Sequence, residues 1–259
     1  MLDDETIDAL AARLDEAVEN ASAISMLTAE HALGLDDAYR VQRAGIALRK
    51  VRGETLTGMK MGLTSKAKME QMGVHAPIYG HLTEAMRLDD GGVLDKRAHC
   101  HPRCEPEVAF LLGKDLAGPV SPAEALLAVD GVCAALEIID SRYQDFKFTL
   151  PDVVADNASS ARFVLGTTVK RSADIDLGNL GMVMELNGQI SQIGSSAAIY
   201  EHPARSLATL ANLLAELGET LKAGQVVLAG GATQAIAVHE GDRVLLRVDA
   251  LGTTSFSVR

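Results

Sequence analysis

Cys104-Glu105-Pro106-Glu107-Val108-Ala109-Phe110 places two acids, one residue apart, at the start of an apolar run. In an extended chain successive side chains alternate between two faces, so Glu105 and Glu107 would project from the same side of a strand. Pro106 cannot donate a backbone hydrogen bond, which predicts an edge, a bulge or a strand end. The stretch therefore predicts a β-strand with a carboxylate pair on one face.

A third acid, Glu137, interrupts the apolar run from Leu126 to Ile139. A buried carboxylate needs a cation, a partner or a proton. Carboxylates held close together repel one another, and a hard divalent cation such as Mg²⁺ removes that repulsion by taking their oxygens as ligands. A bare Glu-x-Glu is more often a solvent-facing strand. Glu137 favours the metal site over that alternative.

Length and composition narrow the class of protein. A chain of 259 residues can hold one large domain, or a catalytic domain with a small appendage. Its formal net charge of −11 and pI near 5.1 argue against nucleic acid or an anionic membrane as a partner. Three cysteines without zinc-finger spacing indicate free thiols in a reducing compartment. With no signal peptide and no apolar run near about 18 residues, we expect a cytoplasmic protein without a membrane span.

The N-terminal part differs in pattern from the rest. Apolar residues recur every three or four positions from Asp3 to Val18 and from Asp36 to Arg52, which predicts two helices. After Gly53 short apolar runs alternate with glycines, as is typical of strands, turns and loops. We therefore predict a helical portion over residues 1–72 and a β-rich, metal-binding catalytic domain over residues 73–259.

The later patterns predict helices mixed with many short strands. Ser121-Pro122 opens a helix that we expect to run through Ala134 and to lead into a strand at Leu136–Asp140. Asn187-Gly188 indicates the turn of a hairpin. Further elements are expected from His202-Pro203 to Ala215 (helix), and at Val226–Leu228, Arg243–Val248 and Ser255–Arg259 (strands). This mixture favours an α+β fold over a doubly wound sheet.

Three other segments are candidate ligand sites. Lys60 lies in an apolar, glycine-flanked segment and suits a substrate carboxylate or enolate oxygen, although a surface lysine is the commoner case. The small and hydroxyl-bearing residues of Val153–Ala161 would let the backbone approach an anion, or they form a helix cap. Gly230-Gly231 with Thr233 could wrap a carboxylate, or form a tight turn.

Four motifs together resemble the hydratase and decarboxylase group of the fumarylacetoacetate hydrolase superfamily. They are Lys60-Met61-Gly62-Leu63-Thr64-Ser65, the pair Glu105-x-Glu107, Glu137 in Leu-Glu-Ile-Ile-Asp-Ser-Arg, and Val154–Ser160. The resemblance covers most of the chain and implies the family's mixed β-rich roll with helices around it. Cys104 and Pro106 depart from the family pattern, where an aliphatic residue and alanine are usual.

The resemblance also implies roles for individual residues. Glu105, Glu107 and Glu137 would bind Mg²⁺ or Mn²⁺, Lys60 would be catalytic, and no organic cofactor is needed. The implied substrate site comprises Leu63, Ile78, Asp156, Ser159, Ser160 and Thr233. The cation that meets a distal substrate carboxylate stays open between Lys147, Arg142 and Arg162.

The segments Ala67–Gly80 and Asp140–Phe148 are similar to those of the decarboxylases in this group. Hydratases typically have an aspartate where this chain has Ile78. Adding water to a diene needs a group that handles protons, whereas an apolar pocket around a departing carboxylate helps to release CO₂. The resemblance therefore implies a carboxy-lyase that converts 2-oxohex-3-enedioate to 2-hydroxypenta-2,4-dienoate in the meta-cleavage degradation of aromatic compounds.

Other functions stay open alongside this one. The chain could be a 2-hydroxypenta-2,4-dienoate hydratase on the same scaffold, or a non-catalytic partner that stabilises a hydratase. A carbon–carbon hydrolase of the wider superfamily is a further alternative, but the sequence offers no well-placed His-Glu pair. The resemblance also implies a homo-oligomer and a complex with the hydratase that consumes the unstable product.

Overall fold

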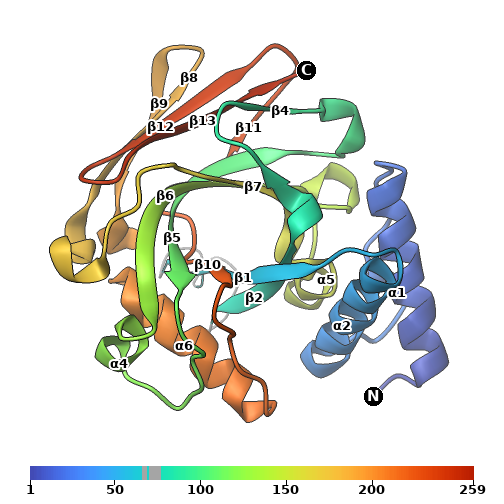
Figure 1. Cartoon of the computed structure of the whole chain (residues 1–259). Coiled ribbons are helices and arrows are strands. Elements are labelled where there is room, and N and C mark those ends of the chain that lie inside the picture. Colours follow the sequence, from blue (N-terminus) through green and yellow to red (C-terminus); the bar gives the residue numbers. More distant parts are fainter. Residues whose placement is uncertain (66–68, 70–76) are drawn as a thin grey trace.

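The computed structural model describes residues 1–65, 69 and 77–259. The two predicted N-terminal helices are confirmed as α1 (Asp4–Glu19) and α2 (Leu35–Val51), which pack against each other (Figure 1). The Asp3 side chain caps α1 by accepting a hydrogen bond from the Thr6 backbone N–H at 2.8 Å. The predicted boundary at 72/73 lies outside the described residues.

The larger sheet curls around the centre of the molecule (Figure 1). Its strands are β1 (Leu56–Gly62), β2 (Ile78–Thr83), β3 (Arg87–Leu88), β5 (Arg103–Leu112), β6 (Val129–Ile139), β7 (Ser160–Leu165), β10 (Val226–Leu228) and β11 (Ile236–Ala237). Within the described residues they run in the order β2-β1-β10-β5-β6-β7-β3, with β11 also beside β5. The two longest strands, β5 and β6, are antiparallel neighbours at the middle of this sheet.

A second sheet lies across one side of the first (Figure 1). Its strands are β4 (Gly92–Leu94), β8 (Gly181–Leu186), β9 (Gln189–Ser195), β12 (Arg243–Val248) and β13 (Gly252–Val258), in the order β4-β13-β12-β8-β9. The predicted hairpin is confirmed, because β8 and β9 meet at Asn187-Gly188, where both residues have positive φ angles. The predicted α+β fold with curled, mixed sheets is confirmed.

The other helices in the described residues are shorter than α1 and α2. They are α4 (Pro122–Leu126), α5 (Leu150–Ala155) and α6 (Pro203–Glu216). Apolar side chains of both sheets and α6 form the main core, with Phe110, Leu136 and Phe256 almost fully buried. A second apolar cluster joins α1 and α2 to α5 around Tyr143 and Val154. Helix α2 therefore packs directly on α5, which precedes the loop that enters β7.

Two local predictions were wrong. The helix expected through Ala134 ends at Leu126, and β6 already begins at Val129, because the whole run pairs with β5 and is buried on both faces. Such a run shows no alternation and cannot be told from a buried helix by periodicity. β5 is also an interior strand rather than an edge. Pro106 is tolerated there because it lies between the positions at which β11 and β10 pair with β5.

Three free cysteines, Cys100, Cys104 and Cys133, agree with the expectation of thiols. Burial raises the pKa of Cys133 to about 12 and that of Cys100 to about 11, so both thiols are poor nucleophiles. Among the described residues we find no helix of the length and apolar character needed to cross a membrane.

Candidate metal centre

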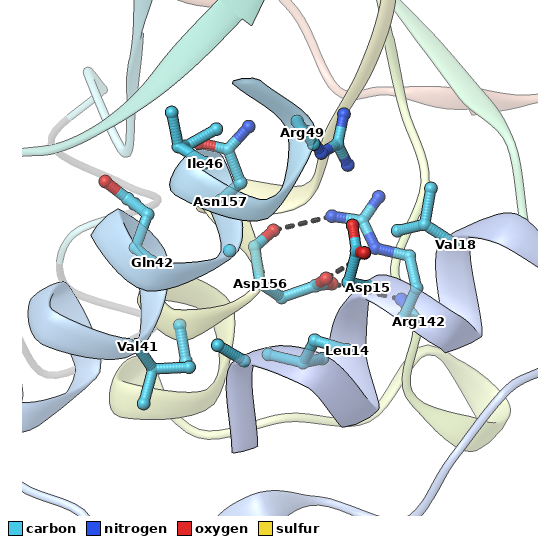
Figure 2. Close-up of a pocket in the computed structure, with 13 residues that line it drawn as sticks. Leu14, Asp15, Val18, Val41, Gln42, Ile46, Arg49, Arg142, Asp156 and Asn157 are labelled. Atoms are coloured by element: carbon cyan, nitrogen blue, oxygen red, sulfur yellow. Dashed lines mark hydrogen bonds and ion pairs between the residues drawn. The ribbon is translucent and has the colours of Figure 1, made fainter. Parts of the chain in front are cut away.

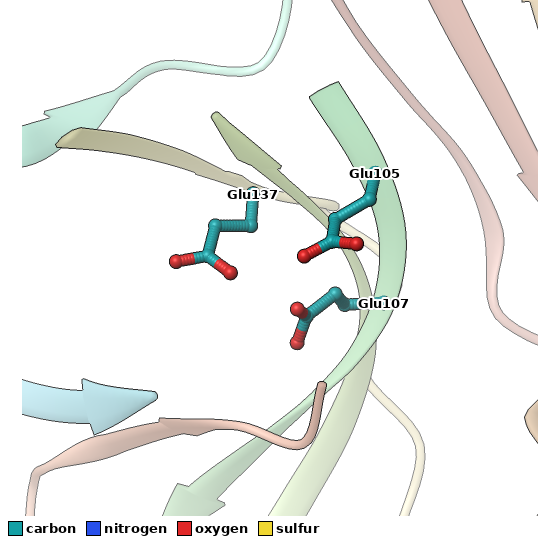
Figure 3. Close-up of side chains that lie close together, drawn as sticks. All are labelled: Glu105, Glu107 and Glu137. Carbon is teal, nitrogen blue, oxygen red and sulfur yellow. The ribbon is translucent and has the colours of Figure 1, made fainter. Parts of the chain in front are cut away.

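Strand register brings the three predicted acids together. Glu105 and Glu107 share one face of β5, and Glu105 pairs directly with Glu137 on β6. One carboxylate oxygen from each residue lies within 4.8 Å of the other two. Figure 3 shows the three side chains turned towards one another. All three residues are buried, with exposed fractions of 6%, 0% and 0% for Glu105, Glu107 and Glu137.

The electrostatics of this group are unfavourable without a cation. Burial, followed by the charges of Glu137 and Glu105, raises the pKa of Glu107 well above its usual range. Burial likewise raises the pKa of Glu137. Within the described part of the chain, Glu107 Oε1 and Glu137 Oε2 have no hydrogen-bond partner. These buried oxygens fit the ligand set of a hard divalent ion, which would supply the missing positive charge.

Lys60 supplies one positive charge at the edge of the group. It lies on β1 and is 2% exposed, and its Nζ is 3.0 Å from Glu137 Oε1. Its single positive charge is smaller than the combined charge of the three carboxylates, which favours a metal ion as a further source of positive charge. Lys60 therefore lies where it can contact both a metal ligand and a bound substrate.

Two glycines in the loop after β10 contact the carboxylates of Glu105 and Glu107. The Gly230 N–H donates to Glu107 Oε2 at 2.7 Å, and Gly230 has φ +112°, a conformation that side chains disfavour. At Gly231 a Cβ atom would lie 2.1 Å from Glu105 Oε2. The sequence suggested that this pair wraps a substrate carboxylate. The structure places it instead against the carboxylates of the protein.

A cavity of about 660 Å³ adjoins the acids. The predicted residues that line it are Lys60, Leu63, Ile78, Glu105, Ser159 and Thr233. These residues come from β1, β2, β5, the turn before β7 and the loop after β10, so the fold assembles the cavity from distant parts of the sequence. Much of the remaining wall is apolar, including Ile139, Phe146, Phe148 and Val153.

Asp156 and Ser160 lie outside this cavity, contrary to prediction. Asp156 is 2% exposed and forms a buried ion pair with Arg142, whose backbone N–H also donates to it at 3.0 Å. Figure 2 shows this pair in a small pocket beside α1 and α2. Ser160 is the first residue of β7 and lines a separate cavity, whereas its neighbour Ser159 lines the cavity beside the acids.

Arg103 is a cavity residue that the sequence analysis missed. It lines the same cavity, and its guanidinium carbon lies 4.1 Å from the centroid of the Phe146 ring. The available signal was its position two residues before Glu105, which places it on the same strand face. Of the cations considered from the sequence, Arg142 is bound to Asp156, Arg162 lines the separate cavity, and Lys147 is largely exposed.

The fold and this site define the class of protein. Residues 60–259 match the family model described as fumarylacetoacetate (FAA) hydrolase C-terminal, and the chain belongs to the fumarylacetoacetate hydrolase family. Within that family it is 50% identical over 251 residues to a 4-oxalocrotonate decarboxylase from a Pseudomonas species, with 97% of each chain covered.

Two further comparisons concern a hydratase and a solved structure of a decarboxylase. A 2-hydroxyhexa-2,4-dienoate hydratase from Comamonas testosteroni is 38% identical over 259 residues, with 98% of each chain covered. Among solved structures, the 4-oxalocrotonate decarboxylase from Pseudomonas putida G7, complexed with magnesium and adipate, is similar with a TM-score of 0.98 at 41% identity. That comparison covers 100% of this chain and 99% of the other. The decarboxylases are thus more similar to this chain than this hydratase is.

Proposed function

We propose that the protein is a Mg²⁺-dependent carboxy-lyase that converts 2-oxohex-3-enedioate, also called 4-oxalocrotonate, to 2-hydroxypenta-2,4-dienoate and CO₂. The reaction would belong to the meta-cleavage degradation of aromatic compounds. The observation that carries the proposal is the buried group of three carboxylates beside Lys60, which adjoins a cavity of about 660 Å³ with a largely apolar wall. The similarity to 4-oxalocrotonate decarboxylases supports the choice of reaction.

Glu105, Glu107 and Glu137 would hold the metal ion, and the relative's complex with magnesium favours Mg²⁺, with Mn²⁺ as a second candidate. When bound, the ion supplies a Lewis acid for the oxygens at the 2-oxo acid end of the substrate. By holding the ion, the three carboxylates would determine that this end of the substrate lies beside β5 and β6. The substrate carries its own electron sink, so the reaction needs no organic cofactor.

In the reaction the bond between C5 and C6 of the substrate breaks, and C6 leaves as CO₂. The electron pair of that bond passes through the conjugated chain to the C2 oxygen, which takes up one proton. Lys60 is buried beside the acids and places its ammonium where negative charge grows on this oxygen. Its side chain therefore stabilises the developing charge as a hydrogen-bond donor.

The wall of the cavity would favour loss of the distal carboxylate. Ile78 is 4% exposed and stands on β2, opposite Gly62 of β1. A charged carboxylate loses hydration among Ile78, Leu63 and the neighbouring aromatic rings, whereas neutral CO₂ does not. The same wall offers no acid at position 78 to deliver a proton to the diene, which separates this site from that of a hydratase.

Product analysis tests the reaction directly. The purified protein with Mg²⁺ is incubated with 2-oxohex-3-enedioate or with 2-hydroxypenta-2,4-dienoate, and CO₂ release and water addition are measured. We expect CO₂ from the dicarboxylate and little hydration of the dienoate. Glu107→Gln should abolish CO₂ release, whereas Glu216→Gln, which alters an exposed acid at the end of α6, should not. Rapid hydration without CO₂ release would instead identify a hydratase.

We infer a cytoplasmic homo-oligomer that also associates with the hydratase acting on its product. The support is the family resemblance, together with the exposed Ile190 and Ile193 on β9, an edge strand of the second sheet. Light scattering of the pure protein, alone and with the hydratase, measures both associations. A monomer whose mass does not change on mixing would contradict them.

A further inference from the structure

The substrate proposed above has two carboxylates, and the metal centre accounts for only one. The second carboxylate needs a cation or other donor when the substrate binds, because an unpaired charge is costly in a partly apolar cavity. Lys60 already contacts Glu137 at the metal-centre end. The recognition of the distal carboxylate therefore calls for a second cationic group that lines the same cavity.

Arg103 is available for this contact. It is half-buried, it lines the active-site cavity, and within the described residues its side chain has no hydrogen bond or ion pair. Its guanidinium lies over the face of the Phe146 ring, with the guanidinium carbon 4.1 Å from the ring centroid. Stacking on a ring face leaves the N–H donors at the edge of the guanidinium free for a carboxylate.

The spacing along β5 matches the length of the substrate. Arg103 and Glu105 are two residues apart on the same strand face, which corresponds to roughly 6.8 Å at about 3.4 Å per residue. A six-carbon chain that is bound at the metal by its C1 end places its C6 carboxylate a similar distance away, since five carbon–carbon bonds span roughly 6 Å. The Arg103 side chain is long and flexible enough to make up the difference between these two distances.

The segment that carries Phe146 shows a constrained backbone. Asp145 and Phe146 both have φ +57°, a left-handed conformation that is uncommon for residues with side chains and most unusual for a bulky one. Backbone strain of this kind concentrates at ligand sites. Here it turns the Phe146 ring towards Arg103, against Phe148 at a centroid distance of 5.4 Å.

We propose that Arg103, held on the Phe146 ring, binds the distal carboxylate of the substrate and makes the site selective for dicarboxylates. The inference rests on the proposed function for the identity of the substrate. A cation on the distal carboxylate stabilises the bound substrate and the transition state to a similar degree, because in the transition state the bond to that carboxylate is only partly broken. Arg103 is therefore a specificity-determining residue that acts on KM and contributes little to kcat.

Binding of two unreactive analogues tests this role in the Mg²⁺-loaded protein. 2-Oxoadipate and 2-oxohexanoate share the 2-oxo acid end and differ by the distal carboxylate alone. By calorimetry we expect the wild-type protein to bind 2-oxoadipate at least about tenfold more tightly, the value of one charged hydrogen-bonded contact. In Arg103→Met the ratio of the two affinities should fall to about one, and Arg103→Lys should restore part of it.

Lys147→Met is the matched control, because Lys147 is a nearby cation that is largely exposed and ion-paired with Asp145 at 3.7 Å. It should keep the wild-type ratio, and Arg103→Met should keep kcat within a few fold at saturating substrate. A wild-type affinity ratio in Arg103→Met overturns the inference, as does a loss of the ratio in Lys147→Met. Failure of the wild-type protein to release CO₂ would reject the proposed reaction, while the binding ratio would still test Arg103.

Discussion

Gly231→Ala should separate metal binding from folding. A Cβ atom at position 231 would lie 2.1 Å from Glu105 Oε2, whereas an ordinary contact needs about 3.4 Å, so the carboxylate must move by about 1.3 Å (3.4 − 2.1). The atom that must move is the far end of a flexible side chain, so a rotamer change can absorb the clash. Metal sites tolerate displacements of only about 0.2 Å. We therefore expect the variant to fold. It should bind Mg²⁺ about tenfold to a hundredfold more weakly than the wild-type protein does.

Calorimetric titration with Mg²⁺ and thermal unfolding of the metal-free protein measure the two effects. The metal-free Tm should stay within about 3 °C of the wild-type value, which corresponds to roughly 1 kcal/mol for a chain of this size. Gly181→Ala is the control, since Gly181 has no atom within 4 Å of its added Cβ atom and lies in the second sheet. The reasoning is refuted if Gly231→Ala binds Mg²⁺ as tightly as Gly181→Ala does.

Three further variants probe the charges and the wall of the site. Glu107→Gln removes one of three buried, mutually repelling acids, so metal-free protein should unfold at a temperature no lower than wild type, and Mg²⁺ should no longer raise its Tm in a thermal shift assay. Ile78→Asp puts a carboxylate into the apolar wall and should lower kcat for CO₂ release at least about tenfold, with Ile78→Val near wild type; equal rates in stopped-flow assays would contradict this. His81→Asn tests acid stability, because burial and then the charges of Lys50 and Arg43 lower the pKa of His81 to about 4. The unfolded chain takes up its proton near pH 6.5, so this contribution is complete above pH 6.5 and falls by roughly 3 kcal/mol as the pH drops towards 4 (about 2.5 pKa units). Urea unfolding at several pH values should show a shallower acid slope for the variant.

The sequence was sufficient for the features that follow from local spacing. Alternation along an extended chain placed Glu105 and Glu107 on one face, and helical periodicity located α1 and α2. Glu137 was recognisable because it interrupts an apolar run. The strand predicted at Leu136–Asp140 contains it, but the pattern predicted a helix over the first part of β6, because β6 is buried on both faces and carries no alternating pattern.

Contacts between distant segments could not be predicted in the same way. The interior place of β5 depends on β10 and β11, which lie more than a hundred residues further along the chain. Asp156 looked like a ligand residue, but the fold pairs it with Arg142 beneath the N-terminal helices. Arg103 had no local signal beyond its strand face, because its role as a cation depends on its stacking with Phe146 and on its having no ion pair among the described residues.

The acids and the cavity wall contribute to the reaction in different ways. Any 2-oxo acid or its enol can bind a divalent ion through oxygens at one end, so Glu105, Glu107 and Glu137 suit a hydratase as well as a decarboxylase. The choice between the two reactions depends on the rest of the cavity wall, which in this protein includes both Ile78 and Arg103. A cation there selects a dicarboxylate, and the apolar wall beside it favours conversion of the distal carboxylate to neutral CO₂. Selection and reaction are therefore divided between two side chains of one cavity, so changing Arg103 should alter which acid binds, whereas changing Ile78 should alter what happens to it.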